Sequence, residues 1–263
     1  LSHIANATLD EVKDFFFRFY APNNAVLAVT GNISFEETVA LTEKWFASIP
    51  KRDVPVRQLP QEPAQTEERR LVVERNVPID SLFMAYHMCE RAHPDYYAFD
   101  ILSDILSNGK SSRLNRHLVQ EKQLFSSIDA YISGTVDAGL FHISGKPAAG
   151  VSLEEAETAV REELNRLQNE AVTVQELEKV KNKFESTQIF GNINYLNVAT
   201  NLAWFELNGA AEDMEKEVER YRSVTAGQLQ AVAQTSFDKR NGVVLYYKGL
   251  SPAVSVREGV KLD

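Results

Sequence analysis

A proline-rich stretch splits this chain of 263 residues into two unequal parts. Residues 50–67 alternate prolines with charged and polar side chains, and no apolar period persists among them. Proline fixes its own backbone φ angle and has no amide proton to donate, so this stretch favours neither a helix nor a central strand. We predict an extended linker over residues 51–67. The prolines are Pro50, Pro55, Pro60 and Pro63.

The segment before the linker, residues 1–50, predicts a helix, a strand and a second helix. Capping-box sequences at Thr8 to Glu11 and at Ser34 to Glu37 begin the two helices. Between them, the apolar run 25–30 is bounded by turn residues, as a buried strand is. The aromatic residues within 15–20 follow helical spacing, and we expect them on two adjoining helix faces buried in a core rather than in contact with a membrane.

The longer part, residues 68–250, alternates pairs of strands with pairs of helices, which predicts an α+β fold: a mostly antiparallel sheet with helices packed on one face. Residues 8–49 and 225–247 both bring a capped helix to an apolar strand, so we interpret 1–50 as the end of a first domain built like the second. Residues 251–263 are expected to form a tail. Strands are predicted at 70–77, 81–88, 126–135, 139–146 and 243–247. Helices are predicted at 94–106, 113–122, 194–207, 211–222 and 225–237, with two more begun by capping boxes at 152–155 and 173–176.

The composition excludes several classes of protein. The net charge is −9 at pH 7, whereas a nucleic-acid binder needs a basic stripe to neutralise phosphates, so we expect no nucleic-acid partner. The longest apolar runs are far shorter than the roughly 20 residues that span a bilayer, so we expect no membrane partner. Cys89 is the single cysteine, which precludes an intrachain disulfide and favours a cytoplasmic location, with the periplasm left open. Its thiol is expected to be buried or half-buried rather than a nucleophile.

No complete catalytic site is visible in the sequence. No histidine has a histidine partner at the i+4 spacing that two zinc ligands on one helix usually show. His87 and His93 flank a predicted turn and could meet at a metal, but surface or capping histidines are the ordinary interpretation. Residues 109–111 (Gly-Lys-Ser) resemble the end of a phosphate-binding loop, yet Ile105 stands where its first glycine belongs, which indicates a turn leading into a helix. We assign no catalytic residue and no metal ligand to this chain.

Three short patterns follow one another in the N-terminal segment. Residues 20–25 read Tyr-Ala-Pro-Asn-Asn-Ala, Gly31-Asn32 ends the apolar run, and residues 46–50 read Phe-Ala-Ser-Ile-Pro. This succession resembles the end of the catalytic domain in the pitrilysin/insulinase-type zinc metallopeptidases, the inverzincins, in their processing-peptidase-like branch. In that family a helix runs into Y-x-P-x-N-A, then an apolar strand ends in Gly-Asp or Gly-Asn, and a further helix closes at F-x-x-I-P.

The part after the linker resembles the homologous, non-catalytic domain of the same family. The similarity rests on 111–114 (Ser-Ser-Arg-Leu), 120–122 (Gln-Glu-Lys), 137–141 (Asp-Ala-Gly-Leu-Phe) and the pair of long helices. With the N-terminal patterns, it covers residues 8–248. The resemblance implies that zinc is held by an inverted H-x-x-E-H helix and a more distant Glu, in the parent protein or in a partner. This sequence contains neither element, so the resemblance implies that this chain itself binds no zinc.

Many members of the family place an Arg and a Tyr seven residues apart in the second domain, where they are thought to hold the substrate backbone. Alignment with that pattern puts Val119 and Ser126 at or near these positions, and neither side chain can do so. Arg116 precedes Val119 by about one helical turn. Tyr131 lies further along the next strand, on the face opposite to Ser126 unless a bulge intervenes. We therefore expect Arg116 and Tyr131 to contact the substrate.

The resemblance implies a function for the parent protein. This chain is expected to be the C-terminal, non-catalytic part of a zinc-dependent endopeptidase that encloses unfolded peptides in a two-domain chamber. Its expected partners are a peptide substrate and a homologous domain or subunit that carries the zinc motif. A homodimer is a further expected partner, because residues 1–50 would lack part of their apolar cover. The alternative is a non-enzymatic scaffold or partner subunit of a processing-peptidase-like complex, which the absent Arg/Tyr pair favours.

Overall fold

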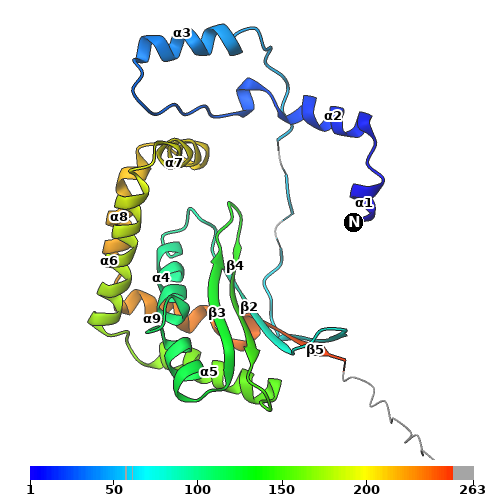
Figure 1. Cartoon of the computed structure of the whole chain (residues 1–263), viewed down its shortest axis with the longest axis vertical. Helices are drawn as coiled ribbons and strands as arrows, with labels where there is room; N and C mark the ends of the chain where they lie inside the picture. Colours follow the sequence, from blue (N-terminus) through cyan, green and yellow to red (C-terminus); the bar gives the residue numbers. More distant parts are fainter. Residues whose placement is uncertain (57, 61, 251–263) are drawn as a thin grey trace, which may run out of the picture. The chain divides into compact units, whose positions relative to one another are not determined.

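A computed structural model describes residues 1–56, 58–60 and 62–250. Figure 1 shows the course of the chain, coloured from the N-terminus to the C-terminus. The tail predicted at 251–263 lies outside the described residues.

The chain falls into two compact units. Unit 1 comprises Leu1–Pro63 and Glu185–Val218, and unit 2 comprises Ala64–Phe184 and the chain from Glu219 onward. Helical residues from the second half of the sequence thus belong to the same unit as the N-terminal segment. The predicted division of the parent protein around the linker stays a prediction.

Unit 2 is built on a five-stranded sheet with the strand order β1-β5-β2-β4-β3. β1 and β5 run parallel, and the other neighbouring strands are antiparallel. This arrangement confirms the predicted mostly antiparallel sheet. The strands are β1 (Arg69–Arg75), β2 (Ser81–Met88), β3 (Phe125–Ser133), β4 (Gly139–Pro147) and β5 (Gly242–Gly249).

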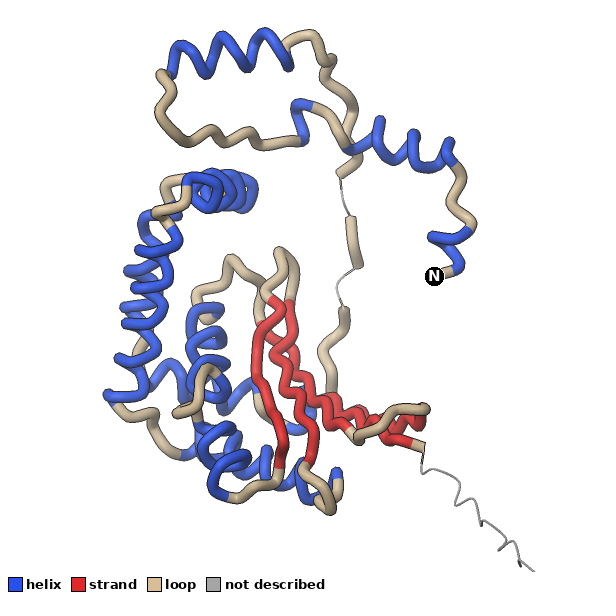
Figure 2. The backbone as a smooth tube through the Cα atoms, viewed as in Figure 1, coloured by secondary structure: helices blue, strands red, loops and turns tan. Residues whose placement is uncertain are grey.

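Helices pack on one face of this sheet, as predicted (Figure 2). Successive side chains of a strand point to opposite faces. In β2, accordingly, the even-numbered residues from Leu82 to Met88 are buried, whereas Phe83 is 41% exposed. The apolar core therefore lies between the sheet and the helices, and the other face is left accessible. The helices that contact the strands are α4 (Tyr96–Ser107), α5 (Leu153–Asn169) and α9 (Ala226–Ser236).

A π-helix, η2 (Asn115–Glu121), leads into β3, where the sequence predicts an ordinary helix over 113–122.

In the helices that follow, Phe184 stacks on Tyr221 with ring centroids 3.5 Å apart. These two rings join α6 to α8. The remaining elements in this part of the sequence are α6 (Val174–Gly191), α8 (Asp213–Ser223) and the short turn η3 (Lys239–Asn241).

Unit 1 contains helices whose caps follow the sequence prediction. The amide of Glu11 donates to the hydroxyl of Thr8 at 3.3 Å, and the amide of Thr8 donates back to the Glu11 carboxylate at 2.7 Å. The amide of Glu37 likewise donates to the hydroxyl of Ser34 at 3.1 Å. The elements that lie wholly in this unit are α1 (Ser2–Ala5), α2 (Leu9–Phe19), the short turn η1 (Pro22–Asn24), α3 (Phe35–Phe46) and α7 (Tyr195–Asn208).

The prediction of a strand at 25–30 is wrong for the described chain. These residues form no ladder with any other described residue. A strand exists only through hydrogen bonds to a neighbouring strand, and the described part of unit 1 consists of helices, turns and loops. The run is instead held at one end, where the hydroxyl of Thr30 donates to the carbonyl of Tyr195 at 2.7 Å.

The expectation of a buried aromatic core around residues 15–20 is also wrong in this chain. Phe15 is 57% exposed and Phe17 is 54% exposed, and Trp45 on α3 is 64% exposed. Among the described residues of unit 1, Ala21 is the one buried apolar residue. The physical reason is the same as for the strand: the described residues of this unit form no sheet against which the two helices could pack.

Candidate functional site

The side of the unit 2 sheet turned away from α4, α5 and α9 forms an accessible surface, called the open face. Strand register aligns Tyr131, His142, Ala85 and Val243 in one row across four strands. Tyr131 is 49% exposed at the β3 end of this row. The half-buried or exposed side chains of the open face include Leu71, Phe83, Ala85, Asp129, Tyr131, His142, Val243 and Leu245.

Tyr131 is held in a small cluster on the open face. Its ring stacks on His142 with centroids 4.9 Å apart and an interplanar angle of 17°. The hydroxyl of Ser133 lies 3.2 Å from Nε2 of His142, which fixes the direction of the imidazole. Partial burial lowers the pKa of His142 and so favours the neutral ring. The two stacked rings form an aromatic platform, and the Tyr131 side chain that carries the phenol hydroxyl is 49% exposed.

A β-bulge lies between Phe125 and Ser127, at the start of β3. The inserted residue, Ser126, is exposed, and its hydroxyl donates to the carbonyl of Lys146 at 3.1 Å. Beyond the bulge the alternation is regular: Ile128 is buried, whereas Tyr131 is exposed together with Asp129. The structure therefore places Tyr131 on the accessible face, where the sequence puts it relative to the core residue Ile128.

Arg116 lies on the surface of η2, and its side chain is 59% exposed. One guanidinium nitrogen lies 3.3 Å from the Glu121 carboxylate, and another lies 3.0 Å from Nε2 of His117. Val119, at the expected position of the family arginine, packs against the core instead. In the part of the chain that the structure describes, no hydrogen bond, ion pair or ring contact joins Arg116 to Tyr131. The structure thus places the two predicted contact residues on adjacent elements but does not bring them together.

The turn from η2 into β3 depends on Gln123, which the sequence analysis missed. Its φ angle is +53°, in the left-handed region, and it is the non-glycine residue with positive φ among those described. Such a conformation favours glycine, since a Cβ atom crowds the backbone there. A polar residue between a helix and an apolar strand carries no sequence signal of this geometry.

The other motifs singled out in the sequence have structural partners. Nδ1 of His87 lies 3.3 Å from the amide oxygen of Asn241, and Nδ1 of His93 accepts from the amide of Asp95 at 3.1 Å. Burial, with nearby carboxylates, raises the pKa of Cys89 to about 11, which leaves a protonated thiol rather than a nucleophile.

The loop at residues 109–111 is a turn before a helix, as expected. Gly109 has a φ angle of +91°, and its carbonyl accepts from the hydroxyl of Ser112 at 2.7 Å. The hydroxyl of Ser111 accepts from the ammonium of Lys179 at 2.6 Å. These contacts tie the loop to its own helix and to α6, and they give it a structural role.

The described ranges 1–56, 58–60 and 62–250 contain neither a cluster of metal ligands nor a membrane-spanning helix. No group of three or more His, Cys, Asp or Glu side chains in these ranges is arranged to hold a metal ion. The described residues therefore do not fit a zinc site, and no chemical step is assigned to zinc on this chain. None of the helices in the same ranges is long and apolar enough to span a bilayer.

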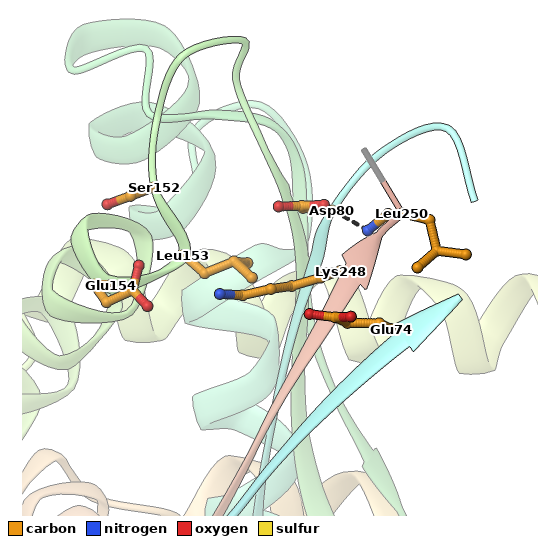
Figure 3. Close-up of a pocket in the computed structure, with 8 residues that line it drawn as sticks. Glu74, Asp80, Ser152, Leu153, Glu154, Lys248 and Leu250 are labelled. Atoms are coloured by element: carbon orange, nitrogen blue, oxygen red, sulfur yellow. Dashed lines mark hydrogen bonds between the residues drawn. The ribbon is translucent and has the colours of Figure 1, made fainter. Parts of the chain in front are cut away.

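A cavity of about 450 Å³ lies where β1 and β5 end beside the first turn of α5 (Figure 3). Its lining includes the carboxylates of Glu74, Asp80 and Glu154 and the ammonium of Lys248. The Asp80 carboxylate accepts from the amide of Gly249 at 2.7 Å. The Ser152 hydroxyl in this lining caps α5 by accepting from the amide of Glu155 at 3.1 Å, which gives it a structural role. The lining residues are Glu74, Asp80, Ser152, Leu153, Glu154, Lys248, Gly249 and Leu250.

Curated proteins and a family model show what this chain is similar to. The model described as the peptidase M16 inactive domain matches residues 6–184. The zinc protease PqqE of Helicobacter pylori is 29% identical over 184 residues, which cover 69% of this chain and 41% of that protein. The uncharacterized zinc protease YmxG of Bacillus subtilis is 25% identical over 184 residues, which cover 70% of this chain and 44% of that protein.

Solved structures share the fold. The crystal structure of a protease from Helicobacter pylori matches with a TM-score of 0.87 at 25% identity, covering 94% of this chain and 60% of that one. A peptidase M16 inactive domain from Pseudomonas fluorescens matches with a TM-score of 0.80 at 21% identity, covering 94% of this chain and 58% of that one, which supports the fold alone.

The family assignment follows from the sequence match and the fold together. The chain spans about half the length of the curated relatives it matches. Its sheet with helices on one face is the fold of the solved inactive domains, and the family match extends over most of the chain, from the N-terminal segment into α6. This chain belongs to the peptidase M16 inactive-domain family, the non-catalytic C-terminal portion of pitrilysin/insulinase-type zinc protease-like proteins.

Proposed function

We propose that the parent protein is a zinc-dependent endopeptidase and that this chain is its non-catalytic part. The observation that carries the proposal is the match of residues 6–184 to the inactive domain, with relatives that are named zinc proteases. The zinc would be held by an H-x-x-E-H helix outside this sequence, in the same parent protein or in a partner subunit. This chain would contribute one wall of the chamber that encloses the substrate.

Residues 1–50 are proposed to be the end of the catalytic-type domain, 51–67 the linker, and 68–250 the second domain. The exposed aromatic side chains of α2 and α3 support this division, because helices with large apolar side chains need a surface to cover them. The run 25–30 supports it as well, because this apolar, extended segment has no strand partner within the described residues, and pairing with a strand of that domain would cover it. Both requirements are met if the catalytic-type domain supplies a sheet.

The substrate is proposed to be an unfolded peptide that lies over the open face. Leu71, Phe83 and Leu245 make one side of this face apolar, whereas Asp129 and Tyr131 make the other side polar. An extended peptide turns every second side chain toward a surface beneath it, where apolar side chains can pack on Leu71, Phe83 and Leu245, and its backbone carbonyls point sideways, toward donors at the border of the surface. The Tyr131 hydroxyl and the Arg116 guanidinium are the proposed donors to those carbonyls.

The test of this proposal is the activity of the isolated chain. The chain is incubated with zinc and a library of quenched fluorescent peptides, in parallel with a chelator control. We expect no cleavage above background, because no catalytic residue or metal ligand is assigned to it. Robust cleavage that a chelator abolishes would overturn the assignment of this chain as the non-catalytic part.

A second candidate function is a non-enzymatic scaffold or partner subunit. Val119 and Ser126, where the family pattern has an Arg and a Tyr, favour it. A structure of complex III from Candida albicans also matches with a TM-score of 0.74 at 17% identity, which supports the fold alone. The coding sequence upstream of Leu1 separates the two functions: an H-x-x-E-H motif there supports the peptidase, and an open reading frame without one supports the scaffold.

We propose the cytoplasm as the compartment of the parent protein, since a chain with one cysteine suits a reducing environment. The periplasm is the competing proposal, because one structural neighbour, PqqL of Escherichia coli, is described as a periplasmic protease. Fractionation of cells that produce the native protein decides between them. Recovery with periplasmic marker enzymes would overturn the cytoplasmic proposal.

A further inference from the structure

His117 stands between a buried carboxylate and the exposed Arg116. Its Nδ1 atom lies 2.9 Å from Oε2 of Glu163 on α5, and its Nε2 atom lies 3.0 Å from Nη2 of Arg116. The Glu163 side chain is 0% exposed and the His117 side chain is 16% exposed, so water has little access to the first of these contacts. The three side chains form a chain of hydrogen bonds from the core to the surface.

The chemistry of the partners determines where the imidazole proton lies. A guanidinium has only N–H donors, so Arg116 can hydrogen-bond Nε2 only if that nitrogen is an unprotonated acceptor. Nδ1 then carries the proton and donates it to the Glu163 carboxylate. The guanidinium of Arg166 lies 3.1 Å from the other oxygen of Glu163, which compensates the buried negative charge. The neutral Nδ1–H tautomer accounts for both contacts of the imidazole, whereas Oε1 of Glu163 has the ion pair with Arg166 but no hydrogen bond among the described residues.

The position of His117 is itself fixed. It lies in the π-helix η2, whose next residue, Leu118, is fully buried in the core. The side chain of Gln120 donates to the carbonyl of Lys110 at 2.8 Å and to the side chain of Asn115 at 2.7 Å, which closes the turn. π-Helical turns are rare and often found at functional sites. The imidazole therefore offers Arg116 an acceptor that cannot easily move.

The other partner of Arg116 is weaker. Glu121 lies 3.3 Å from the guanidinium, but both side chains are more than half exposed, at 59% and 58%. Ion pairs between exposed side chains contribute about 0–1 kcal/mol, because water and salt screen them. The contact with the imidazole is also exposed, but it is shorter, at 3.0 Å, and its partner is anchored to the buried Glu163 carboxylate.

We propose that His117, oriented by the buried Glu163 carboxylate, is a positioning residue that sets the direction of the Arg116 guanidinium. The ligand that Arg116 would then meet is a carbonyl oxygen of an extended peptide backbone, a consequence that rests on the proposed function. The positioning itself rests on the contacts within unit 2 alone. Sequence reasoning singles out Arg116 but gives no sign of Glu163, which is 46 positions away from His117.

The test begins with nitrogen-15 NMR of the full chain, which requires no substitution. The expected signature is a protonated Nδ1 and an unprotonated Nε2 for His117 at neutral pH, with slow rotation of the Arg116 guanidinium. Signals are assigned by their loss in His117→Gln and Arg116→Lys. An Nε2–H tautomer, or a guanidinium that rotates as freely as that of an unpaired surface arginine, would overturn the proposal.

Two matched variants then separate the two nitrogens of the ring. In His117→Gln, the side-chain amide reaches the position of Nε2 and retains an acceptor for Arg116, so slow rotation should persist. In His117→Asn, the amide replaces Nδ1 and still contacts Glu163, but the acceptor is lost, so rotation should become about tenfold faster. Equal rotation in the two variants would contradict the positioning role. Glu121→Gln is the control, with a change of about twofold or less.

The assembled protein, with its zinc-carrying domain, tests the consequence for substrate. If Arg116 holds the peptide, His117→Asn should raise KM for peptides while kcat changes little. His117→Gln should leave KM close to that of the parent protein. An unchanged KM together with faster guanidinium rotation would support the positioning of Arg116 and overturn its contact with the substrate. The two measurements thereby distinguish a failure of the positioning role of His117 from a failure of the proposed substrate contact.

Discussion

Gln123 holds a backbone conformation that its side chain disfavours. Its φ angle of +53° lies between η2 and β3, where the chain must reverse sharply to begin the strand. A non-glycine residue in the left-handed region costs roughly 1–2 kcal/mol, whereas glycine adopts it freely. This single turn therefore lowers the free energy of unfolding of unit 2.

Gln123→Gly should relieve that strain. The greater conformational freedom of glycine stabilises the unfolded state by roughly 0.5–1 kcal/mol, which offsets part of the strain that is relieved. We therefore expect a net rise of about 0.5–1 kcal/mol in the free energy of unfolding. Urea denaturation measures it. Gln120→Gly, inside η2, is the matched control and should lower the same quantity, because it removes two hydrogen bonds. A Gln123→Gly protein less stable than the parent would contradict the strain assigned to this residue.

The second prediction at this scale concerns the substrate contacts of Arg116 and Tyr131. In the assembled protein, Arg116→Ala and Tyr131→Phe should each raise KM for peptides by about 3- to 30-fold, the loss expected when one hydrogen bond to the substrate is removed. Steady-state kinetics on a single fluorescent peptide measure the effect. Lys239→Ala is the control on an exposed turn and should leave KM unchanged. Unchanged KM in both variants would remove these residues from the substrate site.

At the scale of elements, a cluster of charges joins the edge strand β1 to α5 and β5. The Glu157 carboxylate accepts from Arg70 at 2.6 Å, from Arg161 at 2.7 Å and from the Tyr246 hydroxyl at 2.6 Å. Arg161 also pairs with Glu68. Among the described strands β1 pairs with β5 alone, and its Leu71 and Val72 are exposed, so this cluster is an important attachment of β1 to the helical layer.

This cluster predicts an acid-sensitive sheet edge. Burial acts to raise the pKa of Glu157, but hydrogen bonds from Arg70, Tyr246 and Arg161 outweigh it and lower the pKa from 4.5 to about 2. A carboxyl whose pKa is lower in the folded state stabilises the fold above pH 4.5, and this contribution is lost as the pH falls toward 2. Urea unfolding at several pH values should show this loss, on the order of 3 kcal/mol.

Glu157→Gln isolates the contribution of this carboxyl. It should lower stability at pH 7 and flatten the dependence on pH between 5 and 2. Glu154→Gln, on an exposed part of the same helix, is the control and should leave the pH profile unchanged. A Glu157→Gln protein with the full acid sensitivity of the parent would show that other carboxyls are responsible.

The same scale shows what the sequence could and could not predict. The strand at 81–88 has the predicted bounds, because its apolar alternation and flanking turn residues are local signals. The strand at 25–30 fails, because pairing depends on a neighbour that no local pattern reveals. The π-helical turn at 115–121 was predicted as an ordinary helix, since the same apolar spacing serves both. In the candidate site, the exposed side of β3 followed from Ile128, but the bulge and the buried partner of His117 depend on tertiary contacts.

At the scale of the whole molecule, unit 1 exposes an unusual amount of apolar surface. Phe16 is 49% exposed, Trp45 is 64% exposed and Phe46 is 49% exposed. Each large apolar side chain removed from water gains roughly 1.5–3 kcal/mol, and an uncovered extended segment invites pairing with another chain. Burial of this surface against another protein surface is therefore energetically favourable for the isolated chain.

Self-association is the expected result for the isolated chain. Light scattering across a dilution series should show a dimer or larger species that dissociates on dilution. Phe16→Glu with Trp45→Glu should weaken this association at least tenfold, since charges oppose burial. A stable monomer at high concentration, with residues 1–50 resistant to protease, would contradict the homodimer. A monomer whose first fifty residues are digested would contradict it as well, because the segment would then be unfolded.

The central claim is that this chain is the non-catalytic part of a two-domain zinc peptidase. The most direct measurement is peptide cleavage by the chain mixed with a separately produced catalytic-type domain that carries H-x-x-E-H. We predict zinc-dependent cleavage by the mixture and none by this chain alone. The Phe16→Glu, Trp45→Glu variant should reduce activity, because it disrupts the surface through which residues 1–50 are proposed to complete the catalytic-type domain. Full activity of the catalytic-type domain without this chain would contradict the claim.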